Sequence, residues 1–565
     1  YYGGDSVGAA ATESLDLTVD VINKDQLLVV ASCKVSNKRN DLKFYAVIKD
    51  ESGHTVQEFE IENNTVDTVK TEKDLCTATL VLDNLSTGKN LRFGQQDRFK
   101  DAKTSKHLIP GEDLTVTIRV KDTSNNQIQG TSKTVTTNSL FAAVRDHGTG
   151  GLGGADGRTA VIKYGRHLQN LEEASGLNRG TVRNTPVITA AVQERDIQFK
   201  SDESDSWFDL YFDRKFTPIE NTQLKSYDST SGIYHPAIYD LTVETDGDAG
   251  LFKTFAGELK NIRLAGAQIT GKQTISTGLE RDGNVGGLVG KLDGETTIDG
   301  CQVYLSRAKC QLNGKTEKDI WIDGAVSGGL IGDAGNNNLT IENSLAATVI
   351  QGKTAAGGLV GIGHGVISLD HSYADCYLYS DSETTETDAG YASGLIGRRV
   401  VATATLKITD CYAAGFLEGQ TTAGLVACDL SAKNNTLQNI YSACVPLDAD
   451  KLLTYGTAGK NGTGAKVEHV YYLGNSAEST IGTSINYSDL SAENAVEKLF
   501  ASDSSNNAFT RKNSDTYAYN LMKGLGLTLY SYPKLKNLPH YGDWKAEFED
   551  GALVYYERYN DDSYG

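Results

Sequence analysis

The sequence predicts an all-β protein: an N-terminal immunoglobulin-like β-sandwich followed by a right-handed parallel β-helix with short capping helices. Three observations lead to this fold class. Alternating apolar and polar runs fill the first part of the chain, a glycine-rich hexapeptide recurs through the middle, and a second motif recurs between its copies. The composition agrees, because 59 Gly and 28 Tyr against only 7 Pro suit many short strands joined by tight turns.

Seven alternating runs between residues 14 and about 137 predict the β-sandwich. The first reads SLDLTVDVI and the last reads SKTVTT, with polar turns between the runs. Seven short strands at this spacing are typical of a domain of immunoglobulin size. Cys33 and Cys76 fall on two of the predicted strands. They could form a disulfide or remain two core thiols, and the sequence leaves both alternatives open.

The hexapeptide VGGLVG at residues 285–290 returns four more times, as SGGLIG, AGGLVG, ASGLIG and TAGLVA, and the shorter AGLF precedes it. A period near 30 to 40 residues that holds only short strand-like pieces is the signature of a solenoid. These pieces are too rich in glycine and β-branched residues for paired helices, so a stacked β-helix is predicted. The leucine of each copy should line one interior column: Leu251, Leu288, Leu330, Leu359, Leu395 and Leu425.

A second motif recurs seven times in step with the first, for example as LKNIRL at residue 259 and LDHSYA at residue 369. Each copy holds an apolar residue, a polar pair, a small or apolar residue, and often a tyrosine. Because the lengths between copies vary while the motifs do not, insertions are expected in loops, the longest at residues 313–326 and 380–391. The small positions should form a second interior column: Ile262, Cys301, Ser344, Ser372, Cys411, Ile440 and Val470.

A phosphate-binding loop is the alternative explanation of the repeated glycines. Such a loop ends at a helix N-terminus, and no helix pattern follows any copy of the hexapeptide. The G-x-G-x-x-G pattern of Gly148, Gly150 and Gly153 precedes a strand-like run instead of opening a helix, so it does not match a dinucleotide-binding turn. We interpret the repeated glycines as corners where a Cβ would collide with the neighbouring coil.

Asp370, His371, Asp375 and Asp410 are the candidate catalytic residues, because β-helix enzymes that act on polysaccharides need clustered carboxylates. Most of this group falls in the polar pair of the second motif, where Asn343 stands in another copy. We therefore interpret the group as turn residues and predict no catalytic, cofactor or metal site. Calcium binding is possible in an acidic repeat, but no D-x-[DN]-x-[DN]-G loop supports it.

The charge balance makes some partner classes improbable. The formal net charge is -19, from 73 acidic and 54 basic residues, whereas nucleic acids and anionic membranes attract clustered Lys and Arg. No apolar run approaches the roughly 20 residues that would span a bilayer. The sequence therefore predicts no nucleic-acid partner and no membrane span in this chain.

The repeated GGLVG and GGLIG resemble the GLUG motif of large bacterial surface proteins. RHLQNL at 166–171, AAVQERDIQF at 190–199 and YPKLKNLPHYGDW at 532–544 are similar to phrases that flank these repeats in anaerobic Gram-positive gut bacteria. The resemblance covers about residues 158–545. It implies an extracellular β-helix on the bacterial cell surface, used as an adhesin or as part of a pilus-like appendage.

The ends of the β-helix have their own signals. A helix is predicted over residues 167–174, with Leu168 and Leu171 on one face, and another over 491–500, with Ser491 as N-cap. The terminal run ALVYYERY is either a last strand folded onto its own chain or a strand donated to a neighbouring subunit. The residues of this possible subunit-joining strand are Leu553, Val554, Tyr555, Tyr556 and Tyr559.

These signals divide the chain into an N-terminal segment (1–13), the β-sandwich (14–140), a glycine-rich linker (141–158), the β-helix (159–490), a C-terminal cap (491–544) and the terminal strand segment (545–565). The expected function is structural or adhesive: a subunit of a cell-surface filament, or an elongated adhesin with a host glycan or protein as ligand. Self-assembly would occur through the terminal segments. The alternative is a polysaccharide-active β-helix enzyme, either a lyase or a glycosidase.

Overall fold

The structure is a computed structural model that forms two compact units, Tyr1–Ile188 with Ser201–Arg214, and Thr189–Lys200 with Lys215–Gly565. The boundary expected at residue 159 therefore lies inside the first unit. The described residues are separate stretches between 17 and 199, then 216–220, 222–229, 235–274, 280–305, 307–311, 321–380, 390–399, 404–428, 435–447, 453–455, 465–473, 481–492, 494–500 and shorter stretches between 508 and 559.

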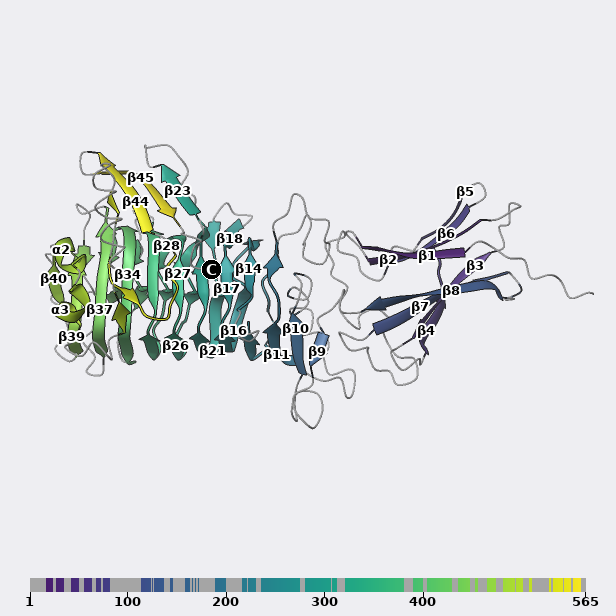
Figure 1. The fold of residues 1–565 in the computed structure, drawn as a ribbon, viewed down its shortest axis with the longest axis horizontal. Helices are drawn as coiled ribbons and strands as arrows, with labels where there is room; N and C mark the ends of the chain where they lie inside the picture. Colours follow the sequence, from purple (N-terminus) through teal and green to yellow (C-terminus); the bar gives the residue numbers. More distant parts are fainter. Residues whose placement is uncertain are drawn as a thin grey trace, which may run out of the picture. The chain divides into compact units, whose positions relative to one another are not determined.

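The first unit contains two four-stranded antiparallel sheets (Figure 1). Buried residues alternate on a strand of each sheet, as Cys76 and Ala78 do in one and Ile118 and Val120 do in the other, so each of these strands has a buried face. The predicted runs missed one strand, β5. The first sheet has the order β1 (Leu17–Asn23), β2 (Leu27–Lys34), β6 (Leu75–Val81), β5 (Thr68–Glu72), and the second the order β4 (Thr55–Glu60), β3 (Lys43–Lys49), β7 (Asp113–Lys121), β8 (Gln127–Thr136).

The predicted glycine-rich linker contains a strand, β9 (Ala143–Arg145), which pairs antiparallel with β10 (Arg158–Ile162). The linker glycines Gly148, Gly150 and Gly153 lie outside the described residues. Of the predicted helix at 167–174, Leu168 and Leu171 are described, and both are helical and buried.

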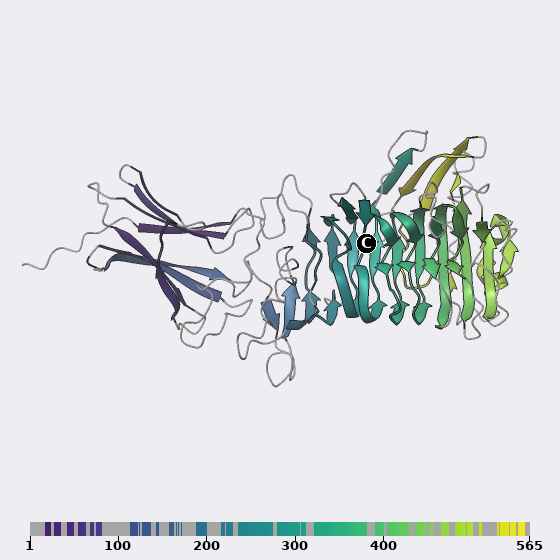
Figure 2. The same cartoon turned by 180° about the vertical axis from the view of Figure 1, so that it is seen from behind.

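The second unit is built around a parallel stack of coils in which each strand pairs with the equivalent strand of the next coil (Figure 2). The predominantly β fold with a large parallel sheet agrees with the predicted fold class. The stack before the glycine-flanked leucine holds β20 (Asn284–Gly286), β24 (Ile322–Gly328), β28 (Val349–Gly357), β32 (Tyr391–Ser393), β35 (Thr421–Ala423) and β38 (Leu453–Tyr455). The stack after that leucine holds β16 (Phe252–Lys260), β21 (Val289–Asp299), β25 (Ile331–Asp333), β29 (Val360–Ile362), β33 (Ile396–Arg399) and β36 (Val426–Cys428).

The second motif forms two further stacks of strands, one on each side of its polar pair, and a shorter stack completes each coil. The first of these stacks holds β11 (Ile188–Gln193), β13 (Ser226–Asp228), the C-terminal parts of β16 and β21, β26 (Leu339–Glu342) and β30 (Ile367–Asp370). The second holds β12 (Ile197–Gln198), β14 (Ala237–Tyr239), β17 (Arg263–Ala265), β22 (Gln302–Tyr304), β27 (Leu345–Ala347), β31 (Tyr373–Tyr379) and β40 (Thr483–Ile485). The long strands β34 (Leu406–Glu418), β37 (Thr436–Pro446) and β39 (Lys466–Leu473) run through both stacks. The shorter stack contains β15 (Thr242–Thr245) and β18 (Gln268–Thr274), and β18 also pairs antiparallel with β19 (Glu280–Asp282).

The interior of the stack contains both predicted columns. All six leucines of the glycine-flanked motif are fully buried, and so are the small residues of the second motif from Ile262 to Val470. The two predicted loops are less simple. The one at 313–326 overlaps β24, because Ile322 and Val326 are buried and pair with the next coil. In the other, Ser380 is buried and residues 381–389 lie outside the described part.

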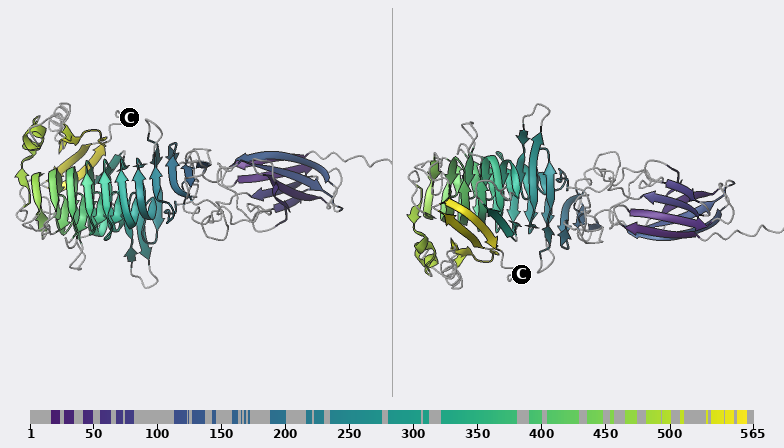
Figure 3. Two further views of the ribbon diagram at one scale, coloured as in Figure 1. Left: turned by 90° about the horizontal axis from the view of Figure 1, so that it is seen from below. Right: turned by 90° about the horizontal axis from the view of Figure 1, so that it is seen from above.

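Beyond the last coils, the chain forms two short helices, α2 (Tyr487–Leu490) and α3 (Ala495–Leu499). The predicted helix at 491–500 therefore begins four residues late, and Ser491 is not its N-cap: Asn494 holds that position without a side-chain capping bond. Val496, Leu499 and Phe500 are buried. Then β41 (Phe509–Thr510) pairs with β43 (Lys534–Leu535), and β23 (Arg307–Gln311), β45 (Ala552–Tyr559), β44 (Asp543–Glu549) and β42 (Thr528–Leu529) form an antiparallel sheet in that order. Figure 3 shows this sheet standing beside the coils.

Candidate functional site

The glycine-flanked leucines form a corner in which the backbones of successive coils are in direct contact. Leu288 donates its N–H to the carbonyl oxygen of Leu330 at 3.0 Å, Leu330 donates to Leu359 at 2.9 Å, and Leu359 donates to Leu395 at 2.9 Å. From Gly287 to Gly394, the glycine before the leucine lies directly over its counterpart in the next coil. A Cβ on Gly358 would overlap the carbonyl oxygen of Gly394 and the Cβ of Ala374. This glycine is needed for space, so the backbone amides of the corner serve the stack.

The polar pair of the second motif forms a corner of a different kind. One residue of each pair adopts a left-handed backbone, with φ between 44° and 55° at the non-glycine positions. Asn and Asp tolerate this conformation better than other L-residues, which explains why they recur here. The residues of this left-handed corner are Asn261, Gly300 (φ 68°), Asn343, His371, Asp410, Asn439 and His469.

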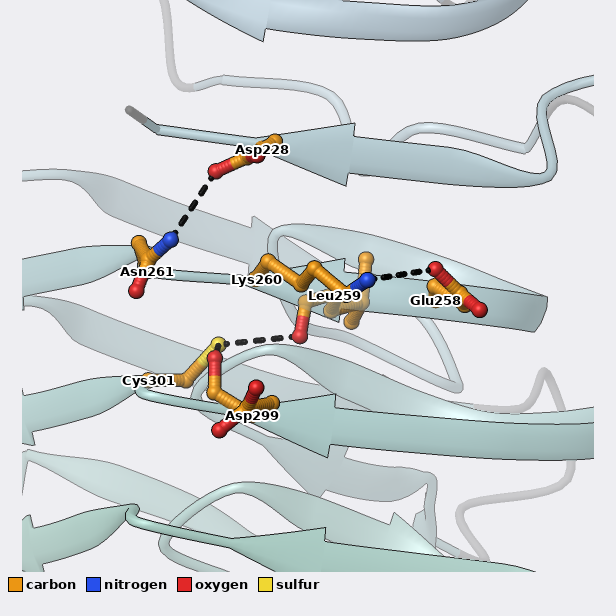
Figure 4. A network of polar contacts seen from close by, with 7 residues as sticks. All are labelled: Asp228, Glu258, Leu259, Lys260, Asn261, Asp299 and Cys301. Carbon is orange, nitrogen blue, oxygen red and sulfur yellow. Dashed lines mark hydrogen bonds and ion pairs between the residues drawn. The ribbon is translucent and has the colours of Figure 1, made fainter. Parts of the chain in front are cut away.

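Amide side chains of the left-handed corner donate hydrogen bonds to aspartates of the preceding coil, and Figure 4 shows the bond from Asn261 to Asp228. Asn261 donates from Nδ2 to Asp228 Oδ1 at 3.1 Å, and Asn343 donates to Asp299 Oδ1 at 2.9 Å. Nearer the C-terminal coils, Asn439 donates to Asp410 Oδ1 at 3.1 Å. The carboxylates of this row are therefore acceptors for the amides of the next coil.

The residue after each left-handed corner is serine or cysteine in four successive coils, and it stabilises the turn. Ser344 and Ser372 donate from Oγ to the carbonyl oxygen two residues earlier, at 2.6 and 2.7 Å. Cys301 and Cys411 make the same contact from Sγ, at 3.7 and 3.1 Å. Burial raises the pKa of the Cys301 thiol to about 12 and raises that of Cys411 further still. These buried thiols lack the low pKa of reactive cysteines.

The four candidate catalytic residues lie in the same neighbourhood, and three of them have structural contacts. His371 and Asp410 are left-handed corner residues. Asp375 is fully buried and accepts a hydrogen bond from the Tyr532 hydroxyl. Burial is the main cause that raises the pKa of Asp410, while the bond from Asn439 opposes it and the charge of Asp370 adds to it. Three of these four residues are thus held by the coil or by the C-terminal segment.

A tyrosine row lies on the outer side of the strands that follow the left-handed corner. Tyr373, Tyr412 and Tyr441 occupy equivalent positions in three coils, and alternate with the interior residues Ala374 and Ala413. Their rings stack with centroids 4.7 and 5.0 Å apart and planes within 3°. All three are nearly fully buried, so another part of the chain covers them.

The cover is the segment 532–541, which we call the strap. Tyr441 donates its hydroxyl hydrogen to the Pro533 carbonyl oxygen, and Tyr373 donates to that of Pro539 at 2.6 Å. His371 donates from Nε2 to the Lys536 carbonyl oxygen at 2.6 Å. The strap thus crosses successive coils in the reverse direction to the chain.

The end of the strap is fixed to an earlier coil. The rings of Tyr541 and Tyr304 stack with centroids 3.7 Å apart and planes within 6°. The Tyr541 hydroxyl donates to Gln302 Oε1, and burial raises its pKa. Residues from the two short helices and β41 complete the same apolar cluster, including Val496, Phe500 and Phe509. The strap, the helices and the outer side of the coils therefore form one packed layer.

The possible subunit-joining strand lies in β45, where it is paired on both sides within its own chain. Tyr555, Tyr556 and Tyr559 pair with residues of β23, and Leu553 pairs with Phe548 of β44. The register with β44 shifts at Val554, between Glu547 and Phe548, which is a β-bulge. The structure thus has the terminal strand folded onto its own chain.

Cys33 and Cys76 are directly opposite each other on the neighbouring strands β2 and β6. Directly opposite residues of an antiparallel pair have Cα atoms about 4.5–5.5 Å apart, which is within the range of a disulfide. Both residues belong to one sheet, so a bond between them would link neighbouring strands and not the two sheets. Cys76 is buried, and the disulfide stays a prediction.

Within the described ranges, no group of three or more His, Cys, Asp or Glu side chains is arranged to hold a metal ion. No helix among those residues is long and apolar enough to cross a membrane. Comparisons with protein-family models, curated proteins and solved structures find no match for this chain. The resemblance to GLUG-motif proteins therefore remains a prediction.

Two features of the site escaped the sequence analysis. The strap lies within the predicted C-terminal cap (491–544), but its course over the tyrosine row was not predicted, and neither was the pairing of β23, because the partners of both are distant in the chain. The recurring tyrosine of the second motif was the available signal: a large aromatic residue on the outer side of a coil requires something to cover it.

Proposed function

We propose that this chain is an extracellular structural or adhesive protein of a bacterial surface, a filament subunit or an elongated adhesin. The observation that carries the proposal is the left-handed corner. Its Asn, Asp and His residues, which are also the most plausible chemical groups of the repeat, adopt a strained backbone and bond from coil to coil. Polar residues that are used to hold successive coils together favour a structural role of the repeat over a catalytic one.

The finer parts of the fold belong to the same proposal. The orders β1-β2-β6-β5 and β4-β3-β7-β8 match an immunoglobulin-like sandwich in which one sheet holds strands A, B, E and D, and the other holds C, F and G with one added strand. A right-handed coil follows from the strong preference of parallel crossover connections for that hand. The GLUG resemblance agrees with both.

The terminal strand gives the filament its proposed joint. Among the described strands, β45 pairs with β23 and β44 and with no strand of the parallel stack. It can therefore change partners without opening the stack of coils. Ligands of an adhesin, a host glycan or protein, would bind the variable insertions between the fixed strands.

The experiment is negative-stain microscopy and light scattering on the full chain and on a chain that ends at residue 551. We expect regular fibres from the full chain and single folded rods from the shortened one, with equal circular dichroism for the second unit. Single rods from both chains would eliminate the filament and leave the adhesin. Turnover of an acidic glycan by the full chain would contradict the proposal as a whole.

A further inference from the structure

Among the described strands, the pairing of β45 with β23 is the one that joins the terminal strands to the part of the chain that forms the coils. β42, β44 and β45 form a three-stranded antiparallel unit, and β23 adds to its β45 edge. β23 itself leaves the stack between β22 and β24, as Figures 1 and 2 show. The β23–β45 pair is thus an edge-to-edge contact between two strands that are about 240 residues apart in the sequence.

In the backbone register of this pair, residue types of opposite charge are directly opposite each other. Five residue pairs run from Arg307↔Tyr559 to Gln311↔Tyr555. Lys309 lies opposite Glu557, and Glu557 lies opposite Lys545 on the other side. Opposite charges directly across strands stabilise a pair, and like charges destabilise it. A one-residue slip would remove this match, so the two edges are complementary in one register.

The three-stranded unit has short connections to a firmly held strap. Only Gly542 separates Tyr541, which stacks on Tyr304, from Asp543 at the start of β44. Residues 530–531 are the other connection, between β42 and the strap. The strap has its own contacts with the coils at Tyr441, Tyr373 and Tyr304. Loss of the β23–β45 pair would therefore leave the tyrosine row covered.

We propose that β23 is the acceptor strand of the assembled form, so that β45 of one copy pairs with β23 of a second copy of this chain. This inference rests on the proposed function and names its joint. Each copy offers one donor and one acceptor edge, and unreciprocated exchange is a heterologous contact that generates an open chain of subunits. The β23–β45 pair between two copies has the same backbone hydrogen bonds and the same register as the pair within one copy. The main free-energy cost of assembly is therefore the lost freedom of the two copies relative to each other.

A cross-link at one register pair tests the joint directly. Cys310 lies opposite Tyr556, and directly opposite residues are close enough for a disulfide. A copy that carries Cys310→Ser with Tyr556→Cys is mixed with the native chain, and the mixture is concentrated and mildly oxidised. We expect a covalent dimer of twice the chain mass on a non-reducing gel. The mutated copy alone is the control for the other thiols and should give no dimer.

A third variant, Tyr556→Cys with Cys310 retained, tests whether residues 310 and 556 of one chain are close enough to form a disulfide. In dilute solution it should form the same bond internally and migrate as a monomer. If the mixture gives no dimer while microscopy shows fibres, the joint is wrong and the filament stands. If the mixture gives neither dimer nor fibres while the third variant still closes internally, the exchange is overturned together with the filament.

Discussion

The two corners of each coil solve the same problem, a sharp turn within a stack, by different physical means. The glycine corner is limited by space: a Cβ on Gly358 would overlap the backbone of the next coil. The left-handed corner is limited by conformation, because Asn343 has a φ of 49° and its side chain has room to bond to Asp299. The position before the leucine has room for glycine alone, whereas the left-handed position can hold Asn, Asp, His or Gly. The repeat has these residues at these two positions.

The largest effect is expected at the glycine corner. Gly358→Val should lower the free energy of unfolding of the second unit by about 3 kcal/mol, because overpacking forces the backbone of two coils apart. Urea unfolding followed by circular dichroism measures it. Thr340→Val is the matched control, since Thr340 is partly exposed on β26, and should change stability by less than about 0.5 kcal/mol. Equal effects for the two variants would mean that the corner has room for a side chain.

The left-handed corner should respond less and in a residue-specific way. Asn343→Ala is expected to cost about 2 kcal/mol, from the unfavourable φ and from the lost bond to Asp299. Asn343→Gly should cost less, because glycine already occupies this position at Gly300. Thermal midpoints of the two variants make the comparison. If Asn343→Gly and Asn343→Ala were equally damaging, the lost side-chain bond, which both variants share, would dominate this corner and the conformation would not.

Asp410 predicts a pH dependence of known sign. Burial raises the pKa of Asp410 in the folded protein above its usual value, so folding favours its protonated form. The stabilising contribution is fully present below the unfolded pKa of about 4 and is lost as the pH rises through the folded pKa. Asp410→Asn should remove this dependence, so the variant gains stability relative to the native chain as the pH rises. Thermal midpoints of both chains across that range test the sign, and a relative loss would contradict it.

The smallest effect is expected behind the corner, where serine and cysteine already alternate. Cys301→Ser should change the free energy of unfolding by less than about 1 kcal/mol, because a serine hydroxyl can donate to the Asp299 carbonyl oxygen as Ser344 does to Glu342. Urea unfolding provides the measurement. A loss above about 2 kcal/mol would show that the fit of the sulfur matters more than its hydrogen bond.

The repeated coils could be predicted from the sequence, but the course of the segment that covers their tyrosine row could not. Leu288, Leu330 and Leu359 recur at a period that is visible in the sequence. Every coil of a stack has to turn at the same place, so the same residues recur there. The strap occurs once. Its contacts join Tyr441 to Pro533 and Tyr304 to Tyr541, and pairings over such distances leave no local pattern. The pairing of β45 with β23 escaped the sequence for the same reason.

The helix at residue 495 shows a different limit. Ser491 satisfies the usual N-cap preference, yet the helix starts at Ala495, because Ala495, Val496 and Leu499 pack in the cluster around the tyrosine row. Tertiary packing overrides a capping preference of about 1 kcal/mol. A capping residue alone therefore gave the right helix and the wrong start.

Amide hydrogen exchange on the native chain tests the central claim most directly, namely that the repeated glycines are corners of a stack. The amides of Leu330, Leu359 and Leu395 each donate to the next coil at 2.8–2.9 Å, so they should be protected as strongly as the strands on either side. If these amides exchange as fast as those of an unstructured peptide, the corners are open, and the glycines serve something other than the stack.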